Sequence, residues 1–325
     1  MSRLFEALTA LTVESRLARV AAQAIPAAIP DVISGMIGGK LRTSRPRRAF
    51  PTAEAQFAAG RQAQASRAET SPEAAAEHTG NVAVPGLGIY ASPESRLVAW
   101  TEPNSLGAEK FRALAARLDH LRGQRPLRSL QVTSSTIHEG KTLISGNLAI
   151  TLARYSNART LLVEGDLHRP ALSSALGLPR LRGIADWWTS PGAALEPFVR
   201  RLNAMPLWFL SAGTLGAQPA DLLRSARFEE AFAQLAGEFE WVIVDSTPML
   251  PIVDVNLWSR FVDGALLVVR EGVTRVKLLQ AGLRSLDNPQ WVGVVVNDAD
   301  EFDHADYQGR YYGGGLVEKH SARES

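Results

Sequence analysis

Six short apolar runs, separated by helical stretches, constrain the fold of this chain most strongly. They are rich in Val, Ile and Leu and cover residues 127–133, 160–163, 206–210, 241–244, 264–269 and 291–296. Helical patterns over 141–155 and 220–239 lie between them. Runs that are apolar throughout are typical of parallel strands buried on both faces. Strands that alternate with helices therefore predict a doubly wound, mostly parallel α/β sheet.

Composition divides the chain into four segments. Residues 1–20 have apolar side chains at helical spacing and predict an amphipathic helix. Residues 21–85 form a variable, low-complexity linker region, and residues 86–300 hold the dense apolar pattern of a folded domain. Residues 301–325 are acidic, polar and rich in Gly and Tyr, which predicts a flexible tail.

Charge and cysteine content exclude several classes of function. The 35 Lys and Arg residues nearly balance the 33 Asp and Glu residues, so no nucleic-acid partner is expected. The chain has no cysteine, which excludes disulfides, thiolate catalysis, zinc fingers and iron–sulfur clusters. Val20–Gly39 is apolar, but Pro26, Pro30 and Asp31 favour a short interfacial helix over a membrane span. Basic residues that follow it leave contact with a membrane surface open.

A phosphate-binding loop is the strongest chemical signal. Gly140-Lys141-Thr142 follows a predicted strand and opens a predicted helix, which is the context that such a loop requires. Backbone N–H groups would face the phosphates, Lys141 would neutralise their charge, and the Thr142 hydroxyl would bind Mg²⁺. The predicted nucleotide-binding residues are Ser135, Thr136, Ile137, His138, Glu139, Gly140, Lys141 and Thr142.

Carboxylates follow two predicted strands. Asp245 ends the strand at 241–244, and Glu164 and Asp166 follow the strand at 160–163. The carboxyl ends of parallel strands form the ligand crevice of a doubly wound sheet. We therefore predict that Lys141, Glu164, Asp166 and Asp245 are catalytic and that Thr142, Asp166 and Asp245 bind metal. Asp245 as a simple turn cap, and a loop salt bridge to Arg169, are the structural alternatives.

Together these residues resemble the bacterial tyrosine autokinases of capsule and exopolysaccharide synthesis, which are P-loop proteins akin to the MinD and ParA ATPases. The resemblance covers about residues 92–320. Its motifs occur in the family's order: Ala108–Leu114, Glu139–Thr142 with Gly146–Ala149, Val163–Pro170, Gln218–Ser225, Asp245–Asp254 and Gly293–Asn297.

The resemblance implies an ATP- and Mg²⁺-dependent protein-tyrosine kinase that regulates polysaccharide synthesis. It implies that Asn297 contacts the base, and that Tyr307, Tyr311 and Tyr312 are phosphorylated in trans within a homo-oligomer. It further implies a cytoplasmic protein at the inner face of the plasma membrane, whose partner is a membrane chain-length protein, the polysaccharide co-polymerase.

Several residues depart from the family pattern. Glu164 replaces an Asp that is the family's expected catalytic acid, and His168 replaces an Arg. Ser135 replaces a loop glycine, His138 is also unusual, and Ala115 replaces a second Arg of the leading helix. Two alternatives therefore stay open: a ParA- or MinD-like regulatory ATPase, and a catalytically weak nucleotide-binding scaffold of a polysaccharide export system. Thr136 stands where those ATPases carry a signature Lys, which counts against the first.

Overall fold

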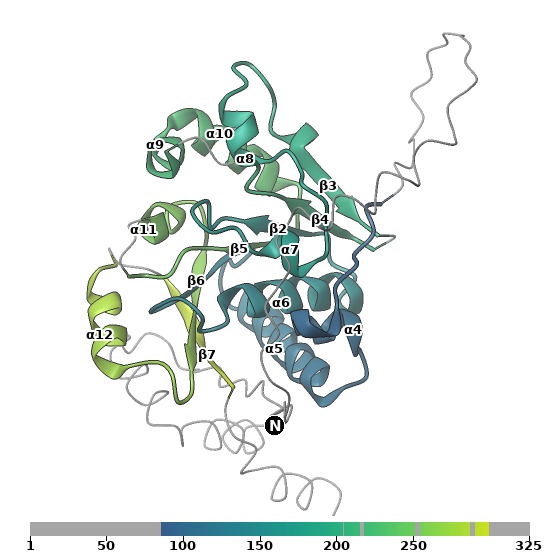
Figure 1. Ribbon diagram of the computed structural model, residues 1–325, viewed down its shortest axis with the longest axis vertical. Coiled ribbons are helices and arrows are strands. Elements are labelled where there is room, and N and C mark those ends of the chain that lie inside the picture. The colour runs from purple at the N-terminus through teal and green to yellow at the C-terminus, as the bar shows by residue number, and fades with distance from the viewer. Residues whose placement is uncertain (1–85, 204, 215–217, 251–253, 287–289, 299–325) are drawn as a thin grey trace, which may run out of the picture. The chain divides into compact units, whose positions relative to one another are not determined.

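A seven-stranded sheet forms the centre of the folded domain (Figure 1). The computed structural model describes residues 86–203, 205–214, 218–250, 254–286 and 290–298. The strands are β1 (Ser129–Ser134), β2 (Thr160–Glu164), β3 (Val199–Leu202), β4 (Leu207–Leu210), β5 (Trp241–Asp245), β6 (Gly264–Arg270) and β7 (Trp291–Asn297). Their order across the sheet is β3-β4-β2-β5-β1-β6-β7.

Helices connect the strands and cover the sheet (Figure 1). The α-helices are α4 (Val98–Thr101), α5 (Leu106–Arg122), α6 (Lys141–Tyr155), α7 (Leu172–Ala175), α8 (Ile184–Trp188), α9 (Pro219–Arg224), α10 (Ala226–Gly237), α11 (Asp254–Trp258) and α12 (Val276–Arg284). Two 3₁₀ turns, η1 (Pro93–Ser95) and η2 (Glu196–Phe198), complete the described elements.

The prediction of a doubly wound, mostly parallel sheet is confirmed. All pairs from β4 to β7 are parallel, whereas β3 pairs with β4 in the antiparallel direction. All six predicted strands are present within two residues of their expected bounds. The apolar pattern missed β3, because this edge strand reads Val-Arg-Arg-Leu and only Leu202 is buried. Edge strands expose one side and tolerate polar residues.

The predicted helix over 220–239 is two helices, α9 and α10. Ser225 separates them because its backbone is extended, with φ −77° and ψ 137°. Its side chain accepts a hydrogen bond from the Phe228 N–H, which caps the first turn of α10. A serine that caps from an extended conformation stops the preceding helix and starts the next one.

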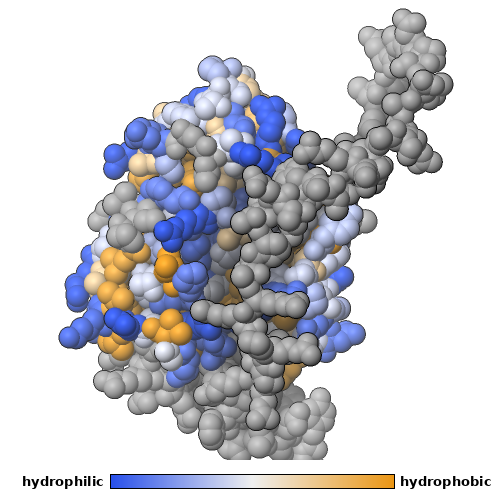
Figure 2. Space-filling model, viewed as in Figure 1, coloured by the Kyte–Doolittle hydropathy of each residue, from blue (hydrophilic) through white to orange (hydrophobic). Residues whose placement is uncertain are grey.

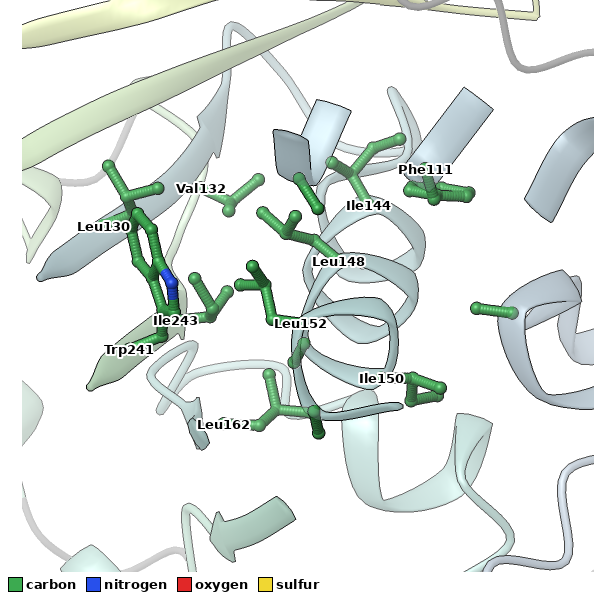
Figure 3. Close-up of a cluster of buried hydrophobic side chains, with 14 of the residues drawn as sticks. Phe111, Leu130, Val132, Ile144, Leu148, Ile150, Leu152, Leu162, Trp241 and Ile243 are labelled. Carbon is green, nitrogen blue, oxygen red and sulfur yellow. The ribbon is translucent and has the colours of Figure 1, made fainter. Parts of the chain in front are cut away.

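The buried apolar residues that the structure describes form three clusters, one on one face of the sheet and two on the other, the smaller of which joins β6 and β7 to α12. On one face, Leu130 of β1 and Ile243 of β5 pack against Ile144 and Leu148 of α6, with Phe111 of α5 behind them (Figure 3). The opposite face buries an aromatic group whose rings meet mostly edge to face, with centroids 5.4–6.0 Å apart. This group comprises Trp187, Phe228, Phe232, Trp258 and Phe261.

Strand order brings the predicted chemical residues to one place. β1 lies between β5 and β6, and β2 lies next to β5, so the carboxyl ends of these strands adjoin. The loops after β1, β2 and β5 therefore meet at one edge of the sheet.

Among the coloured residues in Figure 2, polar groups are widespread and apolar residues gather over α12 on the left. Leu278 of α12 is 37% exposed, and Val273 just before this helix is 47% exposed. None of the helices within the described residues is long and apolar enough to cross a membrane.

Candidate nucleotide-binding site

The loop between β1 and α6 has the backbone that a phosphate cradle needs. Gly140, at the N-cap of α6, has φ 105°, a conformation that favours glycine. A Cβ at this position would lie 2.1 Å from Nδ2 of Asn297, so the site has no room for a side chain. The 15-residue helix that follows directs its free N–H groups and the positive end of its dipole towards this loop.

Hydrogen bonds to Glu139 hold the loop from inside. The Glu139 carboxylate is fully buried and accepts from Ser135 Oγ at 3.0 Å, from Thr136 N at 3.1 Å and from Thr136 Oγ1 at 3.2 Å. Thr274 Oγ1, in the segment between β6 and α12, donates to it at 2.7 Å. Ser135 thus uses its hydroxyl where the common motif has a glycine. The carboxylate of Glu139 faces the protein interior, so only its backbone is available to a phosphate.

Lys141 lies between two strand-end carboxylates. Its ammonium is 2.9 Å from Asp166 Oδ2 and 3.7 Å from Asp245 Oδ1. Burial alone would lower the pKa of Lys141, but attraction to Asp245 and Asp166 outweighs burial and raises it. Lys141 is therefore held as a cation at the opening of α6, where a phosphate would meet it.

Asp245 is buried with an incomplete set of partners. Its side chain is fully buried, and Oδ2 has no hydrogen-bond partner among the described residues. Burial raises the pKa of Asp245 to about 6, against the opposing effects of Lys141 and of a hydrogen bond from Thr142. The Thr247 hydroxyl, two residues on, is also buried without a partner among the described residues. Buried polar atoms without a protein partner mark places where a ligand, an ion or water can bind.

Glu164 has the opposite environment. It is 1% exposed and accepts four hydrogen bonds, from Ser173 N and Oγ at 2.8 Å each and from Ser211 Oγ and Ala212 N at 3.1 Å each. These donors belong to the first turn of α7 and to the residues that follow β4. The carboxylate therefore ties β2 to two neighbouring segments.

Asp166 and His168 lie on the loop after β2. Asp166 accepts the Arg169 N–H at 2.9 Å through Oδ1 and contacts Lys141 through Oδ2. His168 Nε2 lies 2.8 Å from Oδ2 of Asp254, whose side chain is 2% exposed. Burial raises the pKa of Asp254, and His168 opposes that effect. The motif around Asp245 contained Asp254, but sequence spacing alone did not indicate its pairing with His168.

The residues predicted to bind metal fit a magnesium ion. Thr142, Asp166 and Asp245 offer only oxygen atoms, which Mg²⁺ prefers. The ammonium of Lys141 lies 3.5 Å from Thr142 Oγ1 and close to both carboxylates, which shows that this group already accommodates a positive charge. The partnerless Oδ2 of Asp245 leaves one carboxylate oxygen available.

Of the remaining predicted residues, the structure describes some, and the others lie outside the described part of the chain. Ile137 and His138 are exposed, and Asn297 Nδ2 donates to the backbone oxygen of Glu139 at 3.0 Å. The predicted contact of Asn297 with a base stays a prediction. Tyr307, Tyr311 and Tyr312 lie outside the described residues, as do the predicted segments 1–20 and 301–325 and all of 21–85.

No protein-family model matches the chain. Tyrosine-protein kinase YwqD of Bacillus subtilis (strain 168) is 27% identical over 222 residues, which are 68% of this chain and 92% of that protein. Succinoglycan biosynthesis transport protein ExoP of Rhizobium meliloti (strain 1021) is 30% identical over 238 residues, which are 69% of this chain and 30% of that protein. The solved BceF tyrosine kinase domain aligns with a TM-score of 0.56 at 27% identity, covering 63% of this chain and 84% of that one.

The strand, the Gly-Lys-Thr loop and the helix that follows it define a P-loop NTPase domain on a mostly parallel sheet. Within that class, the chain is a relative of the bacterial tyrosine-protein kinases.

Proposed function

We propose that this protein is an ATP-dependent protein-tyrosine kinase that phosphorylates tyrosines of its own C-terminal tail and regulates exopolysaccharide or capsule synthesis. YwqD and the BceF domain are both named as tyrosine kinases. The name of ExoP refers to succinoglycan biosynthesis, which links a relative of this domain to a polysaccharide.

The main structural support for the proposal is the position of Lys141. Lys141, at the N-terminus of α6, contacts Asp166 and Asp245 from two different strand ends. A P-loop lysine beside two carboxylates unites a phosphate-binding cation with groups that hold a metal or accept a proton. A simple turn cap needs no such lysine.

The proposed reaction transfers the γ-phosphoryl group of ATP to a phenol. The tyrosine oxygen forms a bond to the γ-phosphorus, and the bond from that phosphorus to the β–γ bridging oxygen breaks. ADP leaves with the electron pair of that bond, and the phenol proton passes to a carboxylate. Backbone N–H groups of 136–142 and Lys141 orient the phosphates and neutralise the charge that develops on them.

We assign the proton to Asp166. Glu164 is 1% exposed and accepts four hydrogen bonds from the described residues, so its carboxylate is buried and engaged with the protein. Among the described residues, Asp166 Oδ2 is held by Lys141, the lysine that would turn towards phosphate. Thr142 and Asp245 would hold Mg²⁺, which would stabilise charge on the leaving phosphates, and this leaves Asp166 to accept the proton.

The biological setting is part of the same proposal. The three tail tyrosines would enter the site of a second copy, so the active form would be a homo-oligomer. A membrane polysaccharide co-polymerase would be the partner that brings the chain to the inner face of the plasma membrane. The support for this setting is the name of ExoP, of which the matched region covers 30%.

Mass spectrometry after incubation with Mg-ATP tests the proposal. The full chain is expected to gain phosphate on Tyr307, Tyr311 or Tyr312. Tyr90, which is 76% exposed, and Tyr155, which is 44% exposed, serve as internal controls that should stay unmodified.

Each other outcome points to a different function. ATP hydrolysis without a phosphotyrosine would favour a positioning ATPase related to ParA and MinD. Absence of both binding and hydrolysis would favour a non-enzymatic scaffold. Equal labelling of Tyr90 and the tail would indicate a kinase without selectivity for its own tail.

A further inference from the structure

Two donors at the ends of β6 and β7 hold consecutive carbonyl groups of the phosphate loop. Arg270, the last residue of β6, donates through Nη1 to the backbone oxygen of His138 at 3.2 Å. Asn297, the last residue of β7, donates through Nδ2 to the backbone oxygen of Glu139 at 3.0 Å. The two residues are register partners in adjacent strands, so one strand pair supplies both contacts (Figure 1).

Carbonyl orientation decides whether such a loop attracts or repels an anion. A peptide unit points its oxygen and its N–H in opposite directions, because the unit is planar and trans. Fixing the oxygens of His138 and Glu139 towards β6 and β7 therefore turns the N–H groups of Glu139 and Gly140 the other way. His138 takes the left-handed φ of 65°, which is uncommon for a residue other than glycine and needs such support.

Asp298 fixes the position of the Arg270 side chain. Its Oδ2 accepts from Arg270 Nη2 at 2.7 Å and from Nε at 3.0 Å. The guanidinium thus spans two partners, which its planar fork permits and a lysine ammonium would not. Asp298 is followed directly by residues 299–325, which carry the three tail tyrosines.

The same strand ends also reach the inside of the loop. Thr274 Oγ1 accepts the Arg270 N–H at 2.8 Å and donates to the Glu139 carboxylate at 2.7 Å. Glu139 is therefore held through its carboxylate and through its carbonyl by one edge of the sheet.

We propose that Arg270 and Asn297 are positioning residues that clamp the carbonyls of the phosphate loop, with Asp298 as the anchor of Arg270. Asn297 then acts on the loop backbone and serves every ligand with a polyphosphate, whatever its base. The inference rests on the nucleotide binding in the proposed function, and it concerns binding rather than transfer.

Competition between two ligands separates a clamp from a base contact. Binding of a fluorescent ATP analogue to the full chain is competed with Mg-ATP and, separately, with inorganic tripolyphosphate and Mg²⁺. Arg270→Met and Asn297→Ala are each expected to weaken both competitors by about tenfold, which is within the range for one lost hydrogen bond. Asp298→Ala is expected to weaken both competitors by a smaller factor, and to add little to Arg270→Met.

Arg260→Met is the matched control, because Arg260 pairs with Glu229 at 3.3 Å and its side chain is 51% exposed. Thermal unfolding of every variant shows whether it remains folded, and Arg270→Lys provides a milder change if Arg270→Met does not. Arg270→Lys is expected to weaken both competitors too.

Three results would overturn the clamp. One is an unchanged affinity of Arg270→Met or Arg270→Lys for tripolyphosphate. The second is a loss in Asn297→Ala for ATP alone, which would make Asn297 a base contact. The third is full additivity of Asp298→Ala and Arg270→Met. If the unsubstituted chain binds ATP but transfers no phosphate, and the variants still show the expected losses of affinity, the kinase proposal is refuted and the clamp stands.

Discussion

The ends of β2 and β5 place two carboxylates side by side with opposite surroundings. Glu164 and Asp245 are register partners, and both are at most 1% exposed. Glu164 accepts four hydrogen bonds, whereas Asp245 has one oxygen without a partner among the described residues and a pKa raised to about 6. Equal position and burial thus do not imply equal roles. A carboxylate that accepts several hydrogen bonds from the protein stabilises the fold, and we call it saturated here. A carboxylate with an oxygen that lacks a protein partner is available to a ligand.

Loss of Lys141 should reduce activity more than any other change, because this cation lies beside Asp245, the carboxylate that is available to a ligand. Lys141→Met is expected to reduce phosphotransfer by at least about a hundredfold, since a preorganised charge at the transferred group is lost. Quantitative measurement of tail phosphotyrosine over time tests this. Lys277→Met, at an exposed position on α12, is the control that should keep full activity. Comparable activity in both variants would remove Lys141 from the reaction.

Loss of Glu164 should act on stability. Glu164→Ala leaves four buried or half-buried donors without this acceptor, and we expect the free energy of unfolding to fall by about 3 kcal/mol. Urea unfolding with a folded-state probe measures this loss. If Glu164 is structural, the molecules that remain folded should bind Mg-ATP with nearly unchanged affinity. A stable variant that has lost phosphotransfer would instead return Glu164 to the reaction as a catalytic acid.

Low pH should weaken metal binding at Asp245, because it protonates this carboxylate. A metal ion needs the ionised carboxylate, so protons compete with it below the raised pKa of about 6. Metal-dependent ATP binding is expected to weaken by up to about tenfold per pH unit below that value. Titration calorimetry of Mg-ATP binding at about pH 7.5, 6 and 5 measures this loss of affinity. The control, Asp245→Asn, should show weak binding with little dependence on pH in this window.

The stability of the metal-free chain should change in the opposite sense. The folded-state pKa of Asp245 lies above its unfolded value of 3.8, so the folded chain binds this proton more tightly. The ionised carboxylate therefore destabilises the fold above about pH 6, and stability from this group rises as pH falls from about 6 towards 4. Asp245→Asn should remove this part of the pH dependence of unfolding.

The sequence predicted the surroundings of Asp245 better than those of Glu164. Lys141 follows the loop after β1 and Asp245 ends β5, and the apolar runs predicted that both strands belong to a parallel sheet. That β1 pairs directly with β5 is seen only in the structure. The donors to Glu164 were not foreseeable: Ser173 and Ser211 lie nine and 47 residues away and carry no recognisable pattern. Side-chain hydrogen bonds between distant loops depend on tertiary packing, which spacing in sequence does not report.

The loop after β1 shows the same limit on a smaller scale. Gly140 and Lys141 were identifiable because a left-handed N-cap and a phosphate-facing cation require specific residues. Glu139 was expected to face the nucleotide with its neighbours, yet its carboxylate points inward to Thr274, 135 residues later in the chain. Only the fold reveals that one edge of the sheet supports the loop.

Two serines test the comparison with the smallest change, the loss of one hydroxyl. Ser135 Oγ donates to the buried Glu139 carboxylate, a saturated group like Glu164. Ser145 Oγ lies 2.8 Å from the backbone oxygen of Lys141 and 3.4 Å from Asp245 Oδ1. A hydroxyl has one proton, so the shorter contact takes it and Asp245 gains little from Ser145.

Ser135→Ala is therefore expected to lower the free energy of unfolding by about 1.5 kcal/mol, the value of a hydrogen bond to a charged group. Ser145→Ala should cost less than about 0.5 kcal/mol, because the Lys141 oxygen keeps its helical hydrogen bonding and Asp245 loses no strong donor. Parallel urea titrations at neutral pH compare the two variants under one set of conditions. A larger loss for Ser145→Ala would mean that the Ser145 proton serves Asp245. The carboxylate at the end of β5 would then be partly saturated, and its difference from Glu164 would be one of degree.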